Sequence, residues 1–353
     1  AFSFSHVNLT HRNWTAVGQP TLSVYPIVDP RGLITPLFDG WSLDFWVMGD
    51  DSADLLPSRL AETAQRLEMT DNLAVRTRCR QDGLQLTSRA SVVFREGRPE
   101  LMIDVNASGR EGCRLAVALR PYNPEGIQFM ERIDFTHHPP TLHVDREADI
   151  HLNEAPAELY FSNYADGDVI HKVRQGDASA VSGIDCDVGM ATAAALFSIP
   201  ETGNKRLEIR IPLKDDVRPE FPEPPISEKD WGACLGETAS LRIPDEKLRF
   251  LYDASVRALI LLSAKEVVPG PYTYRRFWFR DACFMLNALM GVGLLDRARR
   301  ILSTFPDRQK YSGYFQSQEG EWDSNGQTLW IAARHHRLSG SRLSEKWMTA
   351  IRK

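Results

Sequence analysis

The spacing of apolar residues changes once along this chain, at the proline-rich stretch Val217 to Pro225 (Val-Arg-Pro-Glu-Phe-Pro-Glu-Pro-Pro). Before this stretch, short segments alternate apolar and polar side chains, which is typical of strands. After it, apolar residues recur every three or four positions, which is typical of helices. Prolines fix φ and remove backbone donors, so the stretch itself is expected to be extended. We therefore predict two domains: β structure at residues 1–225 and helices at 245–353, joined by a linker at 226–244.

The first part of the chain contains many short strand-like segments that are separated by turn-forming residues. Ala74 to Cys79 alternates apolar and charged side chains, and Gln81-Asp82-Gly83 and Arg95 to Pro99 are turn sequences. One helical stretch is expected near Ser58 to Leu67. The pattern predicts a large antiparallel β-sandwich, with further strands at 83–86, 90–94, 101–105, 114–120, 142–144, 159–162, 169–173, 193–199 and 207–212.

The last third of the chain has helical spacing throughout. Pro244-Asp245 is expected to start a helix, and an apolar series with helical spacing begins at Leu248. Further helices are expected at 281–295, 297–305, 326–336 and 344–351. In the helix at 326–336, we expect Trp330 and Ile331 to face the core.

Composition narrows the class of protein. The formal net charge of −5 provides no basic field for nucleic acid, and no apolar run approaches the roughly 18 residues that cross a bilayer. The five cysteines are scattered and odd in number, which favours a reducing compartment and predicts a cytoplasmic protein. His137, His138 and His143 lack partners at ligand spacing, and no phosphate or dinucleotide fingerprint occurs, so neither a metal nor a cofactor is expected.

The segment Trp278-Phe279-Arg280-Asp281-Ala282 is a candidate binding site for a polar ligand. It follows the aromatic and basic run Tyr272 to Phe277, and Asp281 is expected to open a helix. An arginine–aspartate pair at such a junction presents fixed donors and acceptors to neighbouring hydroxyls, and an aromatic face can stack on a sugar ring. The alternative is structural, with Asp281 as a helix cap and Trp278 as a core residue.

A second candidate segment lies forty residues further on, at Glu321-Trp322-Asp323-Ser324-Asn325-Gly326-Gln327. It ends a run of amides, acids and aromatics, and the glycines at 313, 320 and 326 mark turns in that run. A loop of this composition is typical of a binding surface on a helical scaffold. Capping of the next helix by Asp323 or Ser324 is the structural alternative, and it is compatible with binding.

These two segments resemble motifs of the six-hairpin, (α/α)6-barrel glycosidases, and most of all the glucoamylase-like and bacterial glycogen-debranching enzymes. In that superfamily an aromatic-Arg-Asp segment enters the second helix, and a Trp-Asp-x-x-Gly loop precedes the next inner helix. The resemblance implies an N-terminal β-sandwich followed by the first hairpins of a barrel. It also implies that Arg280 and Asp281 bind a terminal sugar, and that Trp322, Asp323 and Gln327 line the same pocket. Either Trp322 or Trp278 would stack on the sugar.

The implied reaction is hydrolysis of α-glucosidic bonds in glucans or oligosaccharides, with inversion at the anomeric carbon. An inverting glycosidase needs two carboxyl groups about 6.5–9.5 Å apart. Glu321 and Asp323 are the local candidates for catalysis, although in glucoamylase-like members the general acid and base lie on later hairpins. The disaccharide phosphorylases, which also join a sandwich to a helical barrel, are an alternative, and so is a non-catalytic glucan-binding or interaction fragment.

The length of the helical part bears on this expectation. The 109 residues from Asp245 to Lys353 hold roughly six helices of average length, half of what a closed (α/α)6 barrel contains. The chain is therefore expected to be a truncated member of the superfamily. We expect apolar helix faces at 254–262 and 281–295 to favour self-association, or pairing with the missing half of the barrel.

Overall fold

The structure is a computed structural model that describes residues 13–49, 54–60, 63–70, 72–201, 203–215, 222, 224 and 228–353. The chain divides into two compact units, which we call the β unit (residues 1–18 and 24–214) and the helical unit (residues 19–23 and 215–353). The proline-rich stretch at 217–225 lies outside the described residues, apart from 222 and 224.

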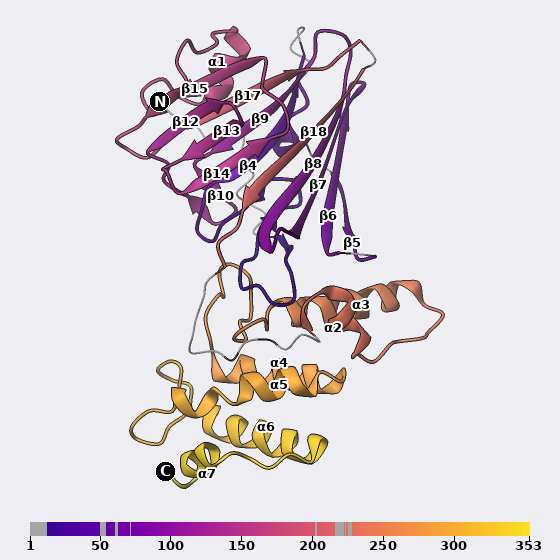
Figure 1. Cartoon of the computed structure of the whole chain (residues 1–353), viewed down its shortest axis with the longest axis vertical. Helices are drawn as coiled ribbons and strands as arrows, with labels where there is room; N and C mark the ends of the chain where they lie inside the picture. Colours follow the sequence, from indigo (N-terminus) through magenta and orange to yellow (C-terminus); the bar gives the residue numbers. More distant parts are fainter. Residues whose placement is uncertain are drawn as a thin grey trace. The chain divides into compact units, whose positions relative to one another are not determined.

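The described strands of the β unit form two large antiparallel sheets and one small hairpin (Figure 1). The first sheet has the order β1 (Thr15–Ala16), β2 (Ile27–Val28), β3 (Ile34–Thr35), β4 (Ser42–Met48), β9 (Arg114–Arg120), β17 (Thr192–Ser198), β15 (Glu158–Ser162). The second has the order β16 (Gly183–Asp185), β12 (Arg132–His137), β13 (Pro140–Val144), β14 (Ala148–Leu152), β18 (Asn204–Pro212), β8 (Arg98–Ser108), β7 (Leu84–Arg95), β6 (Ala74–Gln81), β5 (Ala64–Glu68). The hairpin joins β10 (Tyr122–Asn123) to β11 (Gly126–Ile127).

Alternating side chains bury one face of most strands of the second sheet, as the sequence pattern predicts, whereas the edge strands β5 and β16 have no buried residue. In β8, for example, Leu101, Ile103 and Val105 are fully buried, and the residues between them are half-buried. Residues of β4, β6 and β7 line one small internal space, so the two sheets face each other. The predicted strands at 74–79, 101–105, 114–120, 142–144, 159–162, 193–199 and 207–212 are confirmed, and the segments at 83–86 and 90–94 belong to one continuous strand, β7.

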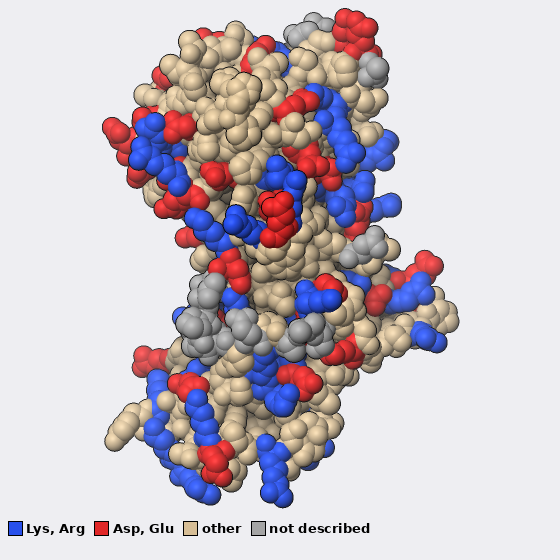
Figure 2. Space-filling model, viewed as in Figure 1, with Lys and Arg blue, Asp and Glu red and all other residues tan. Residues whose placement is uncertain are grey.

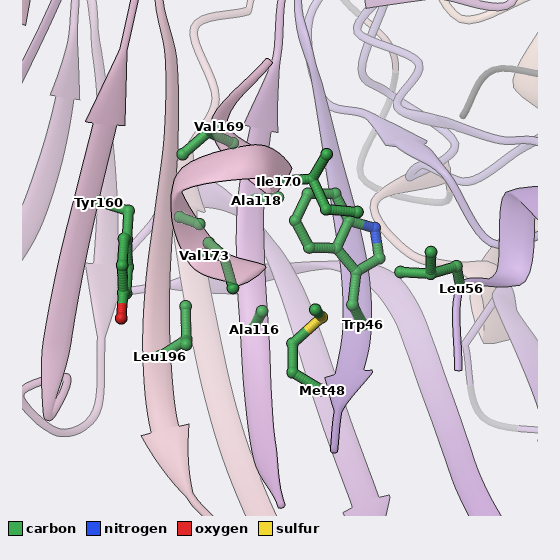
Figure 3. Close-up of a cluster of buried hydrophobic side chains, with 11 residues drawn as sticks. Trp46, Met48, Leu56, Ala116, Ala118, Tyr160, Val169, Ile170, Val173 and Leu196 are labelled. Carbon is green, nitrogen blue, oxygen red and sulfur yellow. The ribbon is translucent and has the colours of Figure 1, made fainter. Parts of the chain in front are cut away.

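The predicted strand at 169–173 is wrong, because this segment is the helix α1 (Val169–Gln175). Asp168 caps the helix by accepting a hydrogen bond from the Ile170 amide at 3.2 Å, and Gly176 ends it with φ of 69°. Val169, Ile170 and Val173 lie on one face of the helix. This face packs over the first sheet in a cluster that includes Trp46, Met48, Ala116, Ala118, Tyr160 and Leu196 (Figure 3).

The predicted helix near Ser58 to Leu67 is also wrong. The 3-10 helix η1 (Pro57–Arg59) is followed by strand β5, which pairs antiparallel with β6. The Gln65 amide nitrogen donates to the hydroxyl of Thr77 on β6 at 3.0 Å and to the carbonyl of Asp29 at 2.7 Å. Pairing with β6 satisfies the backbone groups on one side of β5 and outweighs the helical preference of its side chains.

Ionisable groups lie buried beside the central strands of the first sheet. Arg120 of β9 forms a two-pronged ion pair with Asp168 and a hydrogen bond of 3.0 Å with the Tyr122 hydroxyl. Asp44 of β4 accepts hydrogen bonds from the Trp46 indole at 2.7 Å and from the Phe45 amide at 3.0 Å. Burial raises the pKa of Asp44 to about 6, although the Trp46 hydrogen bond and the Arg120 charge act in the opposite direction.

The described part of the helical unit is built from short helices. They are α2 (Trp231–Gly236), α3 (Glu246–Leu261), α4 (Phe279–Gly291), α5 (Leu295–Leu302), η3 (Phe305–Arg308), α6 (Ser324–Ser339) and α7 (Glu345–Arg352). α3 begins directly after Pro244-Asp245, as predicted, and the side chains of Asp245 and Ser344 cap α3 and α7. The six α-helices within residues 228–353 are half of what a closed barrel needs, so the barrel remains a prediction.

A buried arginine in α5 holds several segments of the helical unit together. Arg297 donates to the carbonyls of Ile260 at 2.9 Å, Ser263 at 3.0 Å and Pro20 at 3.3 Å. It also pairs with the buried carboxylate of Glu228 at 2.7 Å. The bond to Pro20 explains why residues 19–23 belong to the helical unit although the chain then returns to the β unit.

The surface carries charges of both signs and some exposed aromatic residues. Lys, Arg, Asp and Glu all occur across the face shown in Figure 2. Phe284 of α4 and Trp330 of α6 are 56% and 37% exposed, with ring centroids 6.3 Å apart. The expectation that Trp330 faces the core is therefore wrong, whereas Ile331 is fully buried as predicted. Self-association remains a prediction. No helix among the described residues has both the length and the apolar character needed to cross a membrane.

Candidate functional site

The N-terminus of α4 is capped by a loop that follows it by about forty residues. The helix begins at Phe279, and its N-cap residue, Trp278, makes no side-chain capping bond. Instead, the amide of Phe279 donates to the Ser317 hydroxyl, and the amide of Arg280 donates to Glu321 Oε1, both at 3.1 Å. These are two of the backbone donors that a helix cannot satisfy internally. The alternative of Asp281 as the cap is therefore wrong, because the helix starts two residues earlier.

Glu321 is the centre of this cap and is only 2% exposed. Its Oε2 atom accepts from both the amide, at 2.8 Å, and the hydroxyl of Ser317. Because its Oε1 atom accepts from the Arg280 amide, the carboxylate joins the loop to the helix. A negative charge here is also favoured by the dipole of α4. The structure thus places Glu321 beneath the candidate site and hydrogen-bonded to main-chain groups on both sides.

The loop is anchored at its other end by residues at the start of α6. The Ser324 hydroxyl donates to the carbonyls of Phe315 and Glu321, and Asn325 accepts from the Phe315 amide at 2.7 Å. The Phe315 ring is buried between Phe279 and Trp347, with centroid distances of 5.5 and 5.8 Å. The loop is consequently held against the helical core at several points, and its polar side chains project from a fixed backbone.

Three of the predicted binding residues form one hydrogen-bonded array. Arg280 donates to both oxygens of Asp323, from Nε at 3.1 Å and from Nη2 at 2.9 Å, and Gln327 Nε2 donates to Asp323 Oδ2 at 2.8 Å. The Arg280 hydrogen bond lowers the pKa of Asp323, so this carboxylate is ionised at neutral pH. The Arg280 and Asp323 side chains are each 48% exposed, and exposed pairs contribute little to stability. The array is therefore rigidly placed but open to a ligand.

Aromatic side chains flank the array. Trp322, next to Asp323 in the chain, is 75% exposed. The Trp278 indole donates to Gln318 Oε1 at 2.9 Å, and the guanidinium of Arg276 lies 4.2 Å from the Trp278 ring centroid. Trp278 is half-buried and not a core residue. The region thus offers flat apolar faces beside charged donors and acceptors.

The structure brings Arg280, Asp323 and Gln327 together, and it puts Trp278 and Trp322 on the segments that carry them. Asp281 is half-buried in the first turn of α4. Sequence reasoning missed Ser317 and Gln318, which connect the loop to α4 and to Trp278. Their spacing from the aromatic segment gives no signal, because the contacts form only after the loop folds back.

The comparison with solved structures agrees with this architecture. No protein-family model matches the chain, and no curated protein matches it. Among solved structures, the fold is similar to that of a bacterial glucoamylase in complex with acarbose, with a TM-score of 0.65 and 14% sequence identity. The similarity covers 93% of this chain and 56% of the glucoamylase chain, so this chain spans just over half the length of that enzyme. The chain therefore has a glucoamylase-like fold.

Proposed function

We propose that this chain binds α-glucans or oligosaccharides at the array of Arg280, Asp323 and Gln327, and that it belongs to a glycoside hydrolase of glucoamylase or debranching type. The proposal rests on one observation. An exposed array of fixed donors and acceptors lies beside an exposed tryptophan, in a fold similar to that of a glucoamylase solved with acarbose.

The chemistry of the array suits a sugar with adjacent hydroxyl groups. Asp323 is ionised and accepts hydrogen bonds, whereas the guanidinium of Arg280 donates several in one plane. Trp322 offers a flat face for the apolar side of a pyranose ring. Gln327 donates to Asp323 from its Nε2 atom and so helps to orient this carboxylate toward a ligand. In this arrangement Asp281 and Trp278 border the same ligand.

The carboxyl groups predicted as catalytic have different roles in this proposal. Asp323 is paired with Arg280 and ionised, which suits hydroxyl binding better than proton donation. Glu321 is buried and hydrogen-bonded to backbone amides, which makes it a positioning residue for Arg280. We propose inverting hydrolysis of α-glucosidic bonds for the enzyme to which this chain belongs. We do not assign its general acid or its general base to Glu321 or Asp323.

Binding can be tested by calorimetric titration of the 353-residue chain with maltoheptaose and with acarbose. Asp323→Asn removes the ionised acceptor and should weaken binding roughly ten-fold or more. Trp322→Ala should weaken it by several-fold through the loss of the stacking face. Glu319→Gln, at an exposed position in the same loop, is the matched control. Equal affinities for all three variants and the native chain would rule out the array as the sugar site.

The roles of Asp323 and Glu321 favour a second candidate, a glucan-binding chain without hydrolytic activity. Release of glucose from maltooligosaccharides, followed by NMR of the new anomer, distinguishes the two. Release of β-glucose supports an inverting hydrolase, whereas binding without release supports the non-catalytic protein. Phosphate-dependent release would instead indicate a disaccharide phosphorylase.

A further inference from the structure

Two neighbouring helices of the helical unit, α4 and α6, share an exposed apolar surface. Phe284 of α4 and Trp330 of α6 are 56% and 37% exposed, and their ring centroids lie 6.3 Å apart. Residues three, four or seven positions apart lie on the same side of a helix. Ala288 and Gly291 therefore continue this surface along α4, and Ala333 continues it along α6. We call these five residues the α4–α6 face.

The two helices run in the same direction. Their first turns are joined by the ion pair of Arg280 with Asp323, and their middle parts are joined by the contact between Phe284 and Trp330. Both N-termini therefore lie at one end of the α4–α6 face, and both C-termini lie at the other end.

Large and small side chains are separated along this face. Phe284 and Trp330 form a ridge near its N-terminal end, whereas the residues nearer its C-terminal end are small, namely Ala288, Gly291 and Ala333. The seven residues from Phe284 to Gly291 correspond to about 10 Å along the helix axis. If two such faces meet with opposite directions, the ridge of each one lies over the small residues of the other.

Charges on the same side of the helices are also separated. Asp281 lies one turn before the ridge, whereas Arg334 and Arg337 lie one and two turns after it. Arg280 and Asp323 neutralise each other, so the N-terminal end is negative and the C-terminal end is positive. Neither Asp281 nor Arg337 forms an ion pair within the described part of the chain. Both charges are therefore available to a partner.

We propose that the α4–α6 face binds the same face of a second copy of this chain, with the helices of the two copies antiparallel across a two-fold axis. In such an interface every contact occurs twice. Each ridge then lies over the small residues of the other copy, and each Asp281 lies near Arg337 of the other copy. A parallel arrangement would instead place ridge against ridge and Asp281 against Asp281. Shape and charge thus both select the antiparallel arrangement.

The size of the face predicts a weak and reversible dimer. Two helices about 20 Å long and about 8–10 Å apart present a patch of about 400 Å² per copy. Two copies would bury about 800 Å², which is less than a standard specific interface. Aromatic residues at the centre of an interface supply much of its binding energy. We therefore expect a dissociation constant in the micromolar range.

Sedimentation velocity of the chain without any sugar, at about 1 to 100 µM, tests the proposal. The native chain should change from monomer to dimer over this range. Phe284→Ser and Trp330→Ser should each raise the dissociation constant by about ten-fold or more. Tyr311→Ser is the matched control, because Tyr311 is 96% exposed and lies outside α4 and α6. Circular dichroism establishes that each variant is folded.

A pair of charge reversals tests the relative direction of the two copies. Arg337→Glu and Asp281→Lys should each weaken the dimer by several-fold. The combined variant should regain the affinity, because each exchanged charge again lies near an opposite charge. A folding defect cannot produce such a recovery.

The proposal is overturned if the native chain stays monomeric at the highest concentration, or if Tyr311→Ser weakens association as much as the variants of the face. It is also overturned if the combined charge reversal associates no better than the single reversals, because the two copies would then not be antiparallel. Since no sugar is present, these results are independent of the glucan-binding proposal.

Discussion

Replacing Glu321 by glutamine separates a structural role of this carboxylate from a catalytic one. The side chain is buried, and its two oxygens accept hydrogen bonds from the Arg280 amide, the Ser317 amide and the Ser317 hydroxyl. Glutamine has the same shape but presents one NH2 group. In either orientation, at least one backbone N–H of Arg280 or Ser317 then faces a donor and loses its acceptor.

The expected cost follows from these contacts. A lost hydrogen bond to a charged group costs about 1.5–3 kcal/mol, and removing a negative charge from the first turn of a helix costs about 0.3–1 kcal/mol. Glu321→Gln should therefore lower the free energy of unfolding of the helical unit by about 2–4 kcal/mol. Glu319→Gln, in the same loop but exposed, should change it by less than about 0.5 kcal/mol.

Urea unfolding monitored by circular dichroism at 222 nm measures the difference, because the helical unit contributes most of the helical signal. The reasoning is refuted if Glu321→Gln and Glu319→Gln unfold at the same urea concentration with the same slope. If Glu321→Gln keeps native stability but abolishes glucose release, Glu321 acts in proton transfer, and the catalytic interpretation replaces the structural one.

Two further predictions concern the buried charges. The pKa of Asp44 is raised from 3.8 to about 6, so the stability that its protonated form provides is present below about pH 4 and is lost as the pH rises through 6. The Asp44→Asn variant should lack this decline of about 3 kcal/mol in the free energy of unfolding, and urea unfolding of both proteins as a function of pH would detect the difference. Arg297→Met leaves the carbonyls of Ile260 and Ser263 without this donor and removes one partner of Glu228, so it should destabilise the helical unit by about 3–5 kcal/mol. Thermal unfolding measures this loss, and a melting temperature equal to that of Arg299→Gln, at an exposed arginine of α5, would contradict the role.

The periodicity of the sequence predicts much of this fold because most elements bury one regular face. Strands such as β9 and helices such as α3 follow that rule, and a polar cap marks the start of α3. The segment at 169–173 is an exception to the rule that the local sequence pattern predicts the element. Its β-branched residues favour a strand locally, but caps at Asp168 and Gly176 and packing over the first sheet make it helical. Such packing is not visible in the local sequence.

The candidate site is predictable in its composition but not in its connections. The aromatic-Arg-Asp and Trp-Asp segments can be found in the sequence, because charged and aromatic residues cluster there without an apolar period. The pairing of Arg280 with Asp323 across the two segments depends on the loop returning to α4. Likewise, nothing local distinguishes buried Glu321 from exposed Glu319, since both are acids in one polar loop.

The shared cap between the loop and α4 makes two amide hydrogens reporters of loop opening. The first N–H groups of a helix usually exchange quickly with solvent deuterium, because no carbonyl of the helix covers them. Here the amides of Phe279 and Arg280 are bonded to Ser317 and Glu321, so their exchange requires the loop to leave the helix. A ligand that bridges Arg280 and Asp323 would slow this exchange, and assembly of the site could be followed at two backbone positions without any measurement of catalysis.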